Sequence, residues 1–290
     1  MAATSSYLST IRRVPISYFV YSAFSYFGSR RGGELPGSWF VRALRAAERD
    51  EAAIRQTLYR MEREGELTSR RAGRRKFYAP SGYAKAEIEA GTAKIFQRPA
   101  RTWDRRWTMI HVGLRTPALA THRERVMALL AVEGFAQVDA NLFVHPWPAA
   151  ERLYHALPAR ARADVVIVRG ELESPESQPA LVARWRLDRL AQRYGRSVKW
   201  LEALREQVSA GVRDRDAFLM RFAVVFEHLG VAWDDPELPA ELLPAGWPGD
   251  RARRLAASLY DRLLPGATRF ADALLADVLA GSRELERGRK

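Results

Sequence analysis

The sequence predicts an α+β protein of three domains: an N-terminal winged helix-turn-helix, a central ferredoxin-like βαββαβ domain and a C-terminal all-helical domain. The first hundred residues have the periodicity of successive helices followed by a hairpin, and the middle alternates short strand-like runs with helical ones. From residue 178 onward the periodicity is helical. A chain of 290 residues also exceeds one ordinary hydrophobic core. We therefore expect domains over residues 1–101, 102–177 and 178–290.

Two helices are expected before residue 46. Apolar side chains over residues 15–27 recur at helical spacing, and Pro15 suits the first turn of that helix. Residues 28–37 are rich in Gly and Arg, which predicts a loop. Ser38 then follows as the expected cap of the second helix.

The third predicted helix has one apolar face and one basic face. Asp50 begins it, Gly65 ends it, and Ile54, Leu58 and Met61 form the apolar face at spacings of four and three residues. The opposite face carries side chains that can donate hydrogen bonds to bases and phosphates: Arg55, Gln56, Tyr59, Arg60 and Arg63.

A basic hairpin is expected next, with strands over residues 66–71 and 74–79 and a turn at Ala72 and Gly73. Cations crowd around this turn: Arg70, Arg71, Arg74, Arg75 and Lys76. A helix fits the major groove of DNA, and cations on a hairpin can meet the phosphates, so these two elements predict a DNA-binding site. The alternative is an amphipathic helix and a hairpin that are simply exposed to solvent.

The positive charge is concentrated in the first third of the chain. The formal net charge is +13, and residues 1–106 hold 21 Lys and Arg against 10 Asp and Glu, whereas the rest holds 26 against 24. A localised excess is typical of a surface that binds a polyanion, and we expect DNA. We expect no membrane segment, because the apolar run over residues 16–27 is too short to cross a bilayer, and no secretory cleavage site follows it. The absence of Cys suits the cytoplasm.

The rest of the chain supplies the other two predicted domains. A helix over residues 81–98 leads to a junction that contains proline. Strands at 106–114, 135–138, 142–145 and 164–168 and helices at 118–133 and 151–157 give the βαββαβ order. Helices are then expected over 180–194, 197–212, 216–230, 251–264 and 267–285, with a Pro-rich interruption at 234–249.

No catalytic or metal site is predicted. None of the five histidines lies in a His-x-x-x-His or His-Glu-x-x-His spacing. The sequence also lacks a Gly-x-Ser-x-Gly elbow, a phosphate-binding P-loop and a Gly-x-Gly-x-x-Gly turn. We therefore expect neither an enzyme nor a bound cofactor.

Four segments make the chain resemble the PaaX-type regulators, repressors named for the operon of phenylacetic acid degradation. They are residues 54–83, which include the basic hairpin, residues 102–114, which begin with a Trp-Asp-x-x-Trp pattern, and residues 134–146 and 234–249. The resemblance implies a homodimer that binds operator DNA and blocks transcription. It also implies release by an aryl- or acyl-coenzyme A (CoA) thioester, of which phenylacetyl-CoA is the family's best-known effector, and a helical C-terminal domain that serves effector binding and dimerisation.

A CoA thioester needs cations for its phosphates and an apolar slot for its acyl end. The residues that we single out for this role follow predicted strands or lie on a predicted helix: Arg115, His145, Trp147, Arg221 and His228.

Two alternatives stay open. The central domain also resembles the Cas2-like nuclease fold, but its first strand leads into residues 111–115 without a carboxylate for a hard cation, so we do not expect a metal-dependent nuclease. A DNA-binding scaffold without an effector would have the same basic helix and hairpin.

Overall fold

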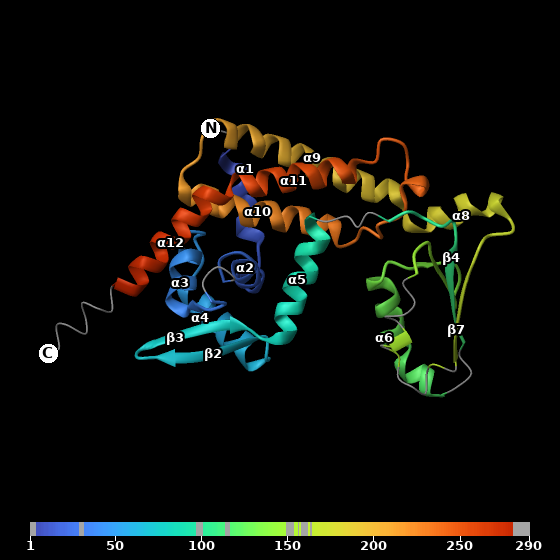
Figure 1. Ribbon diagram of the computed structural model, residues 1–290, viewed down its shortest axis with the longest axis horizontal. Coiled ribbons are helices and arrows are strands. Elements are labelled where there is room, and N and C mark those ends of the chain that lie inside the picture. Colours follow the sequence, from blue (N-terminus) through green and yellow to red (C-terminus); the bar gives the residue numbers. More distant parts are fainter. Residues whose placement is uncertain are drawn as a thin grey trace. The chain divides into compact units, whose positions relative to one another are not determined.

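The computed structural model describes residues 4–28, 32–96, 101–113, 117–148, 154–155, 157, 162 and 164–280. The chain is α+β, mostly helical, with two small antiparallel sheets (Figure 1). Its contacts divide it into two compact units. The first unit combines Met1–Gln97, Tyr194–Trp233 and Pro248–Lys290, and the second combines Arg98–Arg193 and Asp234–Trp247. This division differs from three consecutive domains, because most of the C-terminal helices pack with the N-terminal ones.

The N-terminal segment of the first unit is helical. Helix α2 lies where periodicity predicted it and ends in a π-helical turn over Phe24–Gly28. Helix α1, which precedes it, was not expected. Ser38 is not the cap of helix α3, because that helix begins one residue earlier and Pro36 occupies the N-cap position. The bounds are α1 Thr4–Arg13, α2 Ile16–Ala23, α3 Gly37–Arg45, α4 Glu51–Arg63 and α5 Gly82–Phe96.

Helix α4 confirms the predicted basic helix. The Asp50 carboxylate accepts a hydrogen bond from the Ala53 backbone N–H at 2.8 Å, which satisfies one of the open donors of the first turn. Ile54, Leu58 and Met61 are buried. The helix thus turns its apolar face inward and leaves the basic face exposed.

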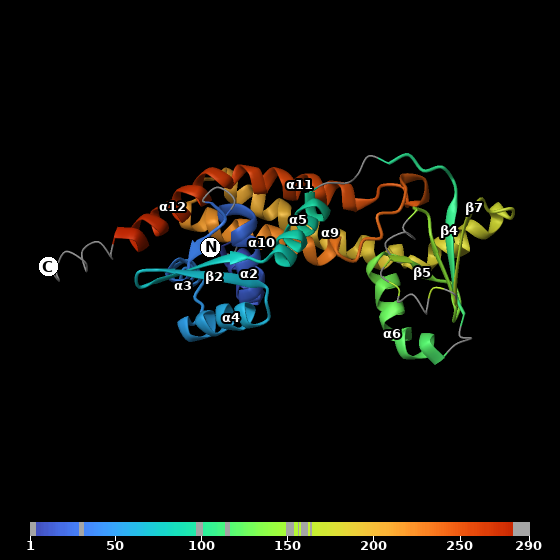
Figure 2. The same ribbon diagram turned by 60° about the horizontal axis from the view of Figure 1, so that its bottom comes forward.

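The hairpin consists of β2 (Leu67–Ala72) and β3 (Arg75–Pro80) (Figure 2). Strand β1 (Leu35–Pro36) pairs with the other edge of β3. Because Ala72 pairs with Arg75, the two-residue turn is Gly73–Arg74, one residue later than predicted. Gly73 has a φ of +59°, a conformation that costs little without a Cβ. The shift places Arg74 at the tip of the hairpin.

Four helices follow in the C-terminal part. Helix α9 is continuous through Gly195, so the predicted break between residues 194 and 197 is wrong. Helix α10 contacts α1, α5, α11 and α12 of the first unit. The bounds are α9 Leu187–Ser209, α10 Asp214–Ala232, α11 Pro248–Arg262 and α12 Leu264–Ala280.

One core joins the N-terminal and C-terminal segments of the first unit. Phe218 of α10 is completely buried, and Phe19, Phe27 and Trp39 from the N-terminal segment surround it with ring centroids 5.5 to 6.3 Å away. The Trp39 indole also donates a hydrogen bond to the Ala271 carbonyl of α12 at 3.1 Å. Helices α2 and α3 therefore bury apolar side chains against partners some two hundred residues away in sequence.

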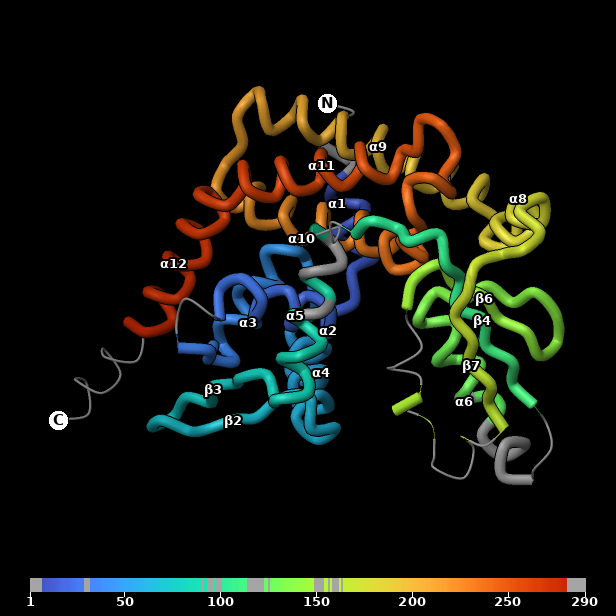
Figure 3. The backbone as a smooth tube through the Cα atoms, turned by 45° about the vertical axis from the view of Figure 1, so that its right-hand side comes forward, coloured from blue at the N-terminus to red at the C-terminus, as the bar shows by residue number. Residues whose placement is uncertain are grey.

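The second unit contains a four-stranded antiparallel sheet with the order β5-β6-β4-β7. Figure 3 labels β4, β6 and β7 of this sheet. Strands β4 and β5, which follow each other in the chain with α6 between them, are separated in the sheet by β6. Strands β6 and β7 are likewise separated by β4. Most of the helix predicted over residues 151–157 lies outside the described residues. The bounds are β4 Trp107–Val112, α6 Pro117–Val132, β5 Ala136–Gln137, β6 Leu142–His145, β7 Val165–Gly170 and α8 Gln178–Val182.

Candidate nucleic-acid interface

The exposed face of α4 is a polar, basic stripe, which we call the α4 face. All its members are exposed, and they recur every three or four residues: Arg55, Gln56, Tyr59, Arg60 and Arg63. The Tyr59 side chain is 62% exposed, which is unusual for a large aromatic residue in the middle of a helix. The stripe therefore offers aromatic, amide and guanidinium groups to a partner at the same time.

Two arginines of the α4 face are held by weak pairs on their own helix. Arg55 Nη2 lies 2.7 Å from Glu51 Oε1, and Arg60 Nη1 lies 2.6 Å from Glu64 Oε2. Exposed pairs at this spacing contribute only about 0.3 to 0.5 kcal/mol. A phosphate or a base edge can therefore replace the carboxylate at little cost.

The cations of the hairpin fall into two groups. Arg70 Nη2 pairs with Glu34 Oε2 at 2.6 Å, Lys76 Nζ with Glu62 Oε2 at 2.5 Å, and the half-buried Arg75 donates to the Leu279 carbonyl at 2.7 Å. Arg71 and Arg74 are exposed at the turn and form no ion pair with another described residue. The structure thus places two of the five predicted cations on an open surface and three in contacts within the protein.

Glu62 fastens the hairpin to α4. Its carboxylate accepts hydrogen bonds from the Lys76 ammonium at 2.5 Å and from the Ser69 hydroxyl at 2.6 Å. The hydrogen bond from Lys76, followed by that from Ser69, holds the pKa of Glu62 below its ordinary value. Because α4 and both strands meet at this ionised group, these contacts hold the hairpin beside α4.

Helix α4 has a width that the major groove of B-DNA can accommodate. An α-helix with its side chains is roughly 10 to 12 Å wide, and the major groove of B-DNA is about 12 Å wide. With α4 in the groove, cations at the end of a hairpin fixed to α4 can contact the flanking phosphates.

Arg221, on α10, is buried in the core. Its guanidinium lies between the rings of Tyr26 and Tyr260, 3.5 and 3.6 Å from their centroids, and it donates a hydrogen bond to the Tyr260 carbonyl. Burial lowers the pKa of Arg221 to about 8. His228 on the same helix is also completely buried, 6.4 Å from the Tyr194 ring. Both side chains are enclosed by their own unit.

His145 and Trp147 lie together in the second unit. The Trp147 backbone N–H donates to His145 Nδ1 at 3.2 Å, and the Trp147 indole donates to the Glu237 carbonyl at 2.8 Å. Burial lowers the pKa of His145 to about 4, so the imidazole is neutral at pH 7. Arg115 lies outside the described residues. The five predicted effector residues therefore do not form one site within a unit.

Two family models match the chain. The model described as PaaX-like protein matches residues 17–84, and the model described as PaaX-like protein C-terminal domain matches residues 185–273. The chain belongs to the PaaX-like protein family. The Transcriptional repressor PaaX of Escherichia coli (strain K12) is 28% identical over 251 residues, which cover 83% of this chain and 78% of that protein.

A solved structure shows the same fold. It is that of the uncharacterized protein Rv0674 from Mycobacterium tuberculosis, with a TM-score of 0.51 and 23% sequence identity, and the match covers 82% of this chain and 90% of that one. In this PaaX-like chain, the first family match contains the α4 face and the whole hairpin. The second contains Arg221 and His228 but neither His145 nor Trp147.

Neither a metal-ligand cluster nor a membrane-spanning helix occurs in the described part of this PaaX-like chain. Within it, no group of three or more His, Asp or Glu residues could hold a metal ion. No helix in the same residues is long and apolar enough to cross a membrane.

Sequence reasoning missed the groups that restrain the hairpin. Glu34 lies in a loop 36 residues before Arg70, and the Leu279 carbonyl is 204 residues from Arg75. No local pattern predicts pairs at such separations. A backbone carbonyl in particular leaves no mark in the sequence.

Proposed function

We propose that this chain is a transcriptional repressor that binds double-stranded DNA. Residues 16–80 would act as a winged helix-turn-helix, with α3 and α4 as the two helices and the β2–β3 hairpin as the wing. The α4 face carries this proposal, because it joins base-reading side chains to a hairpin that Glu62 fastens beside it. The name of the Escherichia coli relative supports the same function.

The side chains would divide between two tasks. Gln56 and Arg60 have the groups that read adenine and guanine in the major groove, and Arg71 and Arg74 would contact phosphates. Arg70, Arg75 and Lys76 would position the hairpin through their contacts with the protein. The second unit would be the ferredoxin-like domain, for which its strand order is the support.

We further propose a homodimer that releases DNA when it binds an aryl- or acyl-CoA thioester such as phenylacetyl-CoA. A dimer matches a palindromic operator when its two reading helices lie about 34 Å apart, one turn of the duplex. An effector that favours another spacing would release the DNA. The family to which the chain belongs supports this part of the proposal.

Arg60→Ala is expected to weaken binding to the preferred DNA by about 1 to 3 kcal/mol and to relax sequence preference. Arg74→Ala should weaken binding equally on all sequences and reduce the slope of log affinity against log salt by about 1. Fluorescence anisotropy with labelled DNA from upstream of the gene, and with a shuffled fragment, measures both. Arg254→Ala, which removes an exposed arginine from α11, is the control. Unchanged affinity in both test variants would disprove the assigned interface.

Phenylacetyl-CoA, compared with free CoA, is expected to raise the melting temperature and to lower the affinity for DNA. A ligand at a hundred times its dissociation constant stabilises the native state by about 2.7 kcal/mol. Thermal denaturation and anisotropy measure the two effects. If the thioester does neither, the effector proposal is wrong, whereas the DNA-binding proposal depends only on the preceding experiment.

A further inference from the structure

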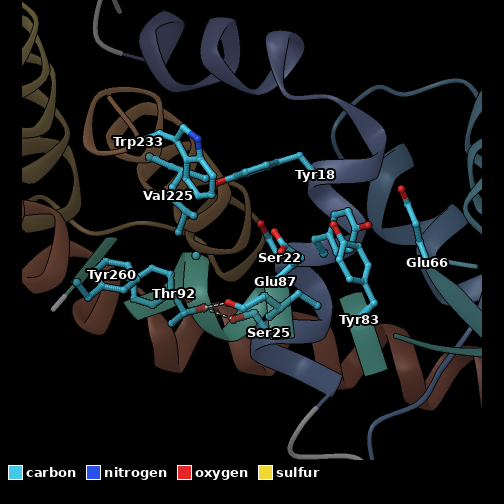
Figure 4. A pocket seen from close by; sticks show the side chains of 15 residues that line it. Tyr18, Ser22, Ser25, Glu66, Tyr83, Glu87, Thr92, Val225, Trp233 and Tyr260 are labelled. Atoms are coloured by element: carbon cyan, nitrogen blue, oxygen red, sulfur yellow. Dashed lines mark hydrogen bonds between the residues drawn. The ribbon is translucent and has the colours of Figure 1, made fainter. Parts of the chain in front are cut away.

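The first unit contains a pocket of about 270 Å³ between α2, α5, α10 and α11 (Figure 4). Its walls are rich in aromatic rings. Tyr260 of α11 is stacked on Phe96 of α5, with ring centroids 4.4 Å apart, and Val225 and Leu229 of α10 complete an apolar interior. A ligand in this pocket would therefore contact aromatic and aliphatic side chains.

Large aromatic side chains are exposed where the pocket meets solvent. Tyr83 is 70% exposed and Trp233 is 48% exposed, and both line the pocket. The Tyr18 hydroxyl points toward Trp233 and Val225 (Figure 4). It is buried and makes no hydrogen bond of good geometry with another described residue. The pocket thus offers an open aromatic entrance and a hydroxyl that can bond to a ligand.

The charged groups of the pocket are carboxylates. Glu66 and Glu87 line it, whereas no Lys or Arg is among the described residues that line it. Burial, followed by a hydrogen bond to Glu66, raises the pKa of Tyr21 above its ordinary value, so Tyr21 remains a neutral donor. An anion placed here would meet like charges, and the nearby Arg221 guanidinium is stacked on the Tyr260 ring rather than among the lining residues.

We propose that this pocket binds a small aromatic ligand whose polar end is uncharged or positively charged. Stacked rings favour an aromatic partner, and rings together with carboxylates favour a cation over an anion. Two carboxylates, with no Lys or Arg among the described lining residues, disfavour a carboxylate or phosphate inside the pocket. The phosphates of a CoA molecule would have to stay outside it.

The pocket also adjoins the base of the hairpin. Glu66 directly precedes β2 and Tyr83 lies three residues after β3, and the Ser81 N–H donates to the Glu66 carbonyl at 2.9 Å between the two ends. A ligand that contacts Glu66 and Tyr83 would therefore touch the chain next to both strands, at the base of the hairpin. We expect it to lower DNA affinity, and this part of the inference rests on the proposed function.

Gly91 of α5 permits a direct test, because a Cβ added there would meet no atom within 4 Å although the residue lines the pocket. Gly91→Phe should fill the pocket and leave the fold intact, since phenylalanine favours a helix more than glycine does. Gly195→Phe makes the same change at another open position, within α9 and away from the pocket. Unchanged far-UV circular dichroism checks the fold of both variants.

The probes are benzylamine, benzyl alcohol and benzoate, measured by isothermal titration calorimetry with the full chain. We expect the amine and the alcohol to bind, and benzoate to bind at least about tenfold more weakly than the amine. Gly91→Phe should reduce the affinity for the amine by at least about tenfold, and Gly195→Phe should leave it unchanged.

The outcomes separate the site from its effect on DNA. Equal or tighter binding of benzoate, no binding of any probe, or equal binding by Gly91→Phe would overturn the proposed site. If benzylamine binds and leaves the DNA affinity unchanged, the coupling is wrong and the site stands. If the protein binds no DNA at all, the proposed function fails, and the calorimetry still decides whether the site exists.

Discussion

Phe218→Ala is expected to lower the free energy of unfolding of the first unit by about 3 to 5 kcal/mol. Phe218 is completely buried at the point where α10 meets the aromatic rings of the N-terminal segment. The substitution leaves a cavity among rigid rings, and domains are only about 5 to 15 kcal/mol stable in total. Urea denaturation followed by far-UV circular dichroism measures the loss.

Tyr59→Ala is the matched control, because it removes an aromatic ring that is 62% exposed. Its stability should change by less than about 0.5 kcal/mol, whereas its DNA affinity should fall. Phe218→Ala is therefore expected to lower the free energy of unfolding, whereas Tyr59→Ala is expected to leave it nearly unchanged. If Phe218→Ala left the N-terminal helices as stable as before, the N-terminal and C-terminal segments of the first unit would not share one core.

Acidification from pH 6.5 to pH 4 is expected to destabilise the second unit by about 3 kcal/mol through His145 alone. Burial lowers the pKa of His145 from 6.5 to about 4, and its Nδ1 accepts a hydrogen bond from the Trp147 N–H, which requires a neutral ring. Within this range the unfolded chain binds a proton that the folded chain does not. The contribution of the neutral His145 to stability is therefore fully present above pH 6.5. It falls as the pH decreases, and below about pH 4 this group causes no further loss.

His145→Asn isolates this contribution, since the amide oxygen can accept the same N–H while the side chain does not titrate. The difference in unfolding free energy between the two proteins should narrow by about 3 kcal/mol between pH 6.5 and pH 4 in tryptophan-fluorescence denaturation. Nuclear magnetic resonance titration reports the pKa of His145 directly. A folded-state value near 6.5 would contradict the prediction.

The elements with strong local signals could be predicted from sequence. Asp50 and the spacing of Ile54, Leu58 and Met61 define α4, and the structure confirms each of them. The turn was misplaced by one residue because Ala72–Gly73 and Gly73–Arg74 are both acceptable two-residue turns, and only the pairing of the strands separates them. A break was predicted between residues 194 and 197, yet packing keeps α9 continuous there: Tyr194 and Val198 are buried.

What could not be predicted depends on contacts between distant residues. The basic hairpin was predicted from five neighbouring cations, but the partners that hold three of them are Glu34, Glu62 and Leu279. The pocket is equally hidden, since its walls come from four helices and no segment of the chain carries its pattern. Counting charges indicates that the hairpin is basic, but only the fold shows which of its cations are exposed.

The shared core of the first unit also has a consequence for synthesis. Trp39 has its hydrogen-bond partner, Ala271, on the last described helix, and the rings around Phe218 come from both ends of the unit. A ribosome must therefore release nearly the whole chain before helices α2 and α3 find all their packing partners. Incomplete chains from interrupted translation would therefore lack the side chains that complete the core around Trp39 and Phe19.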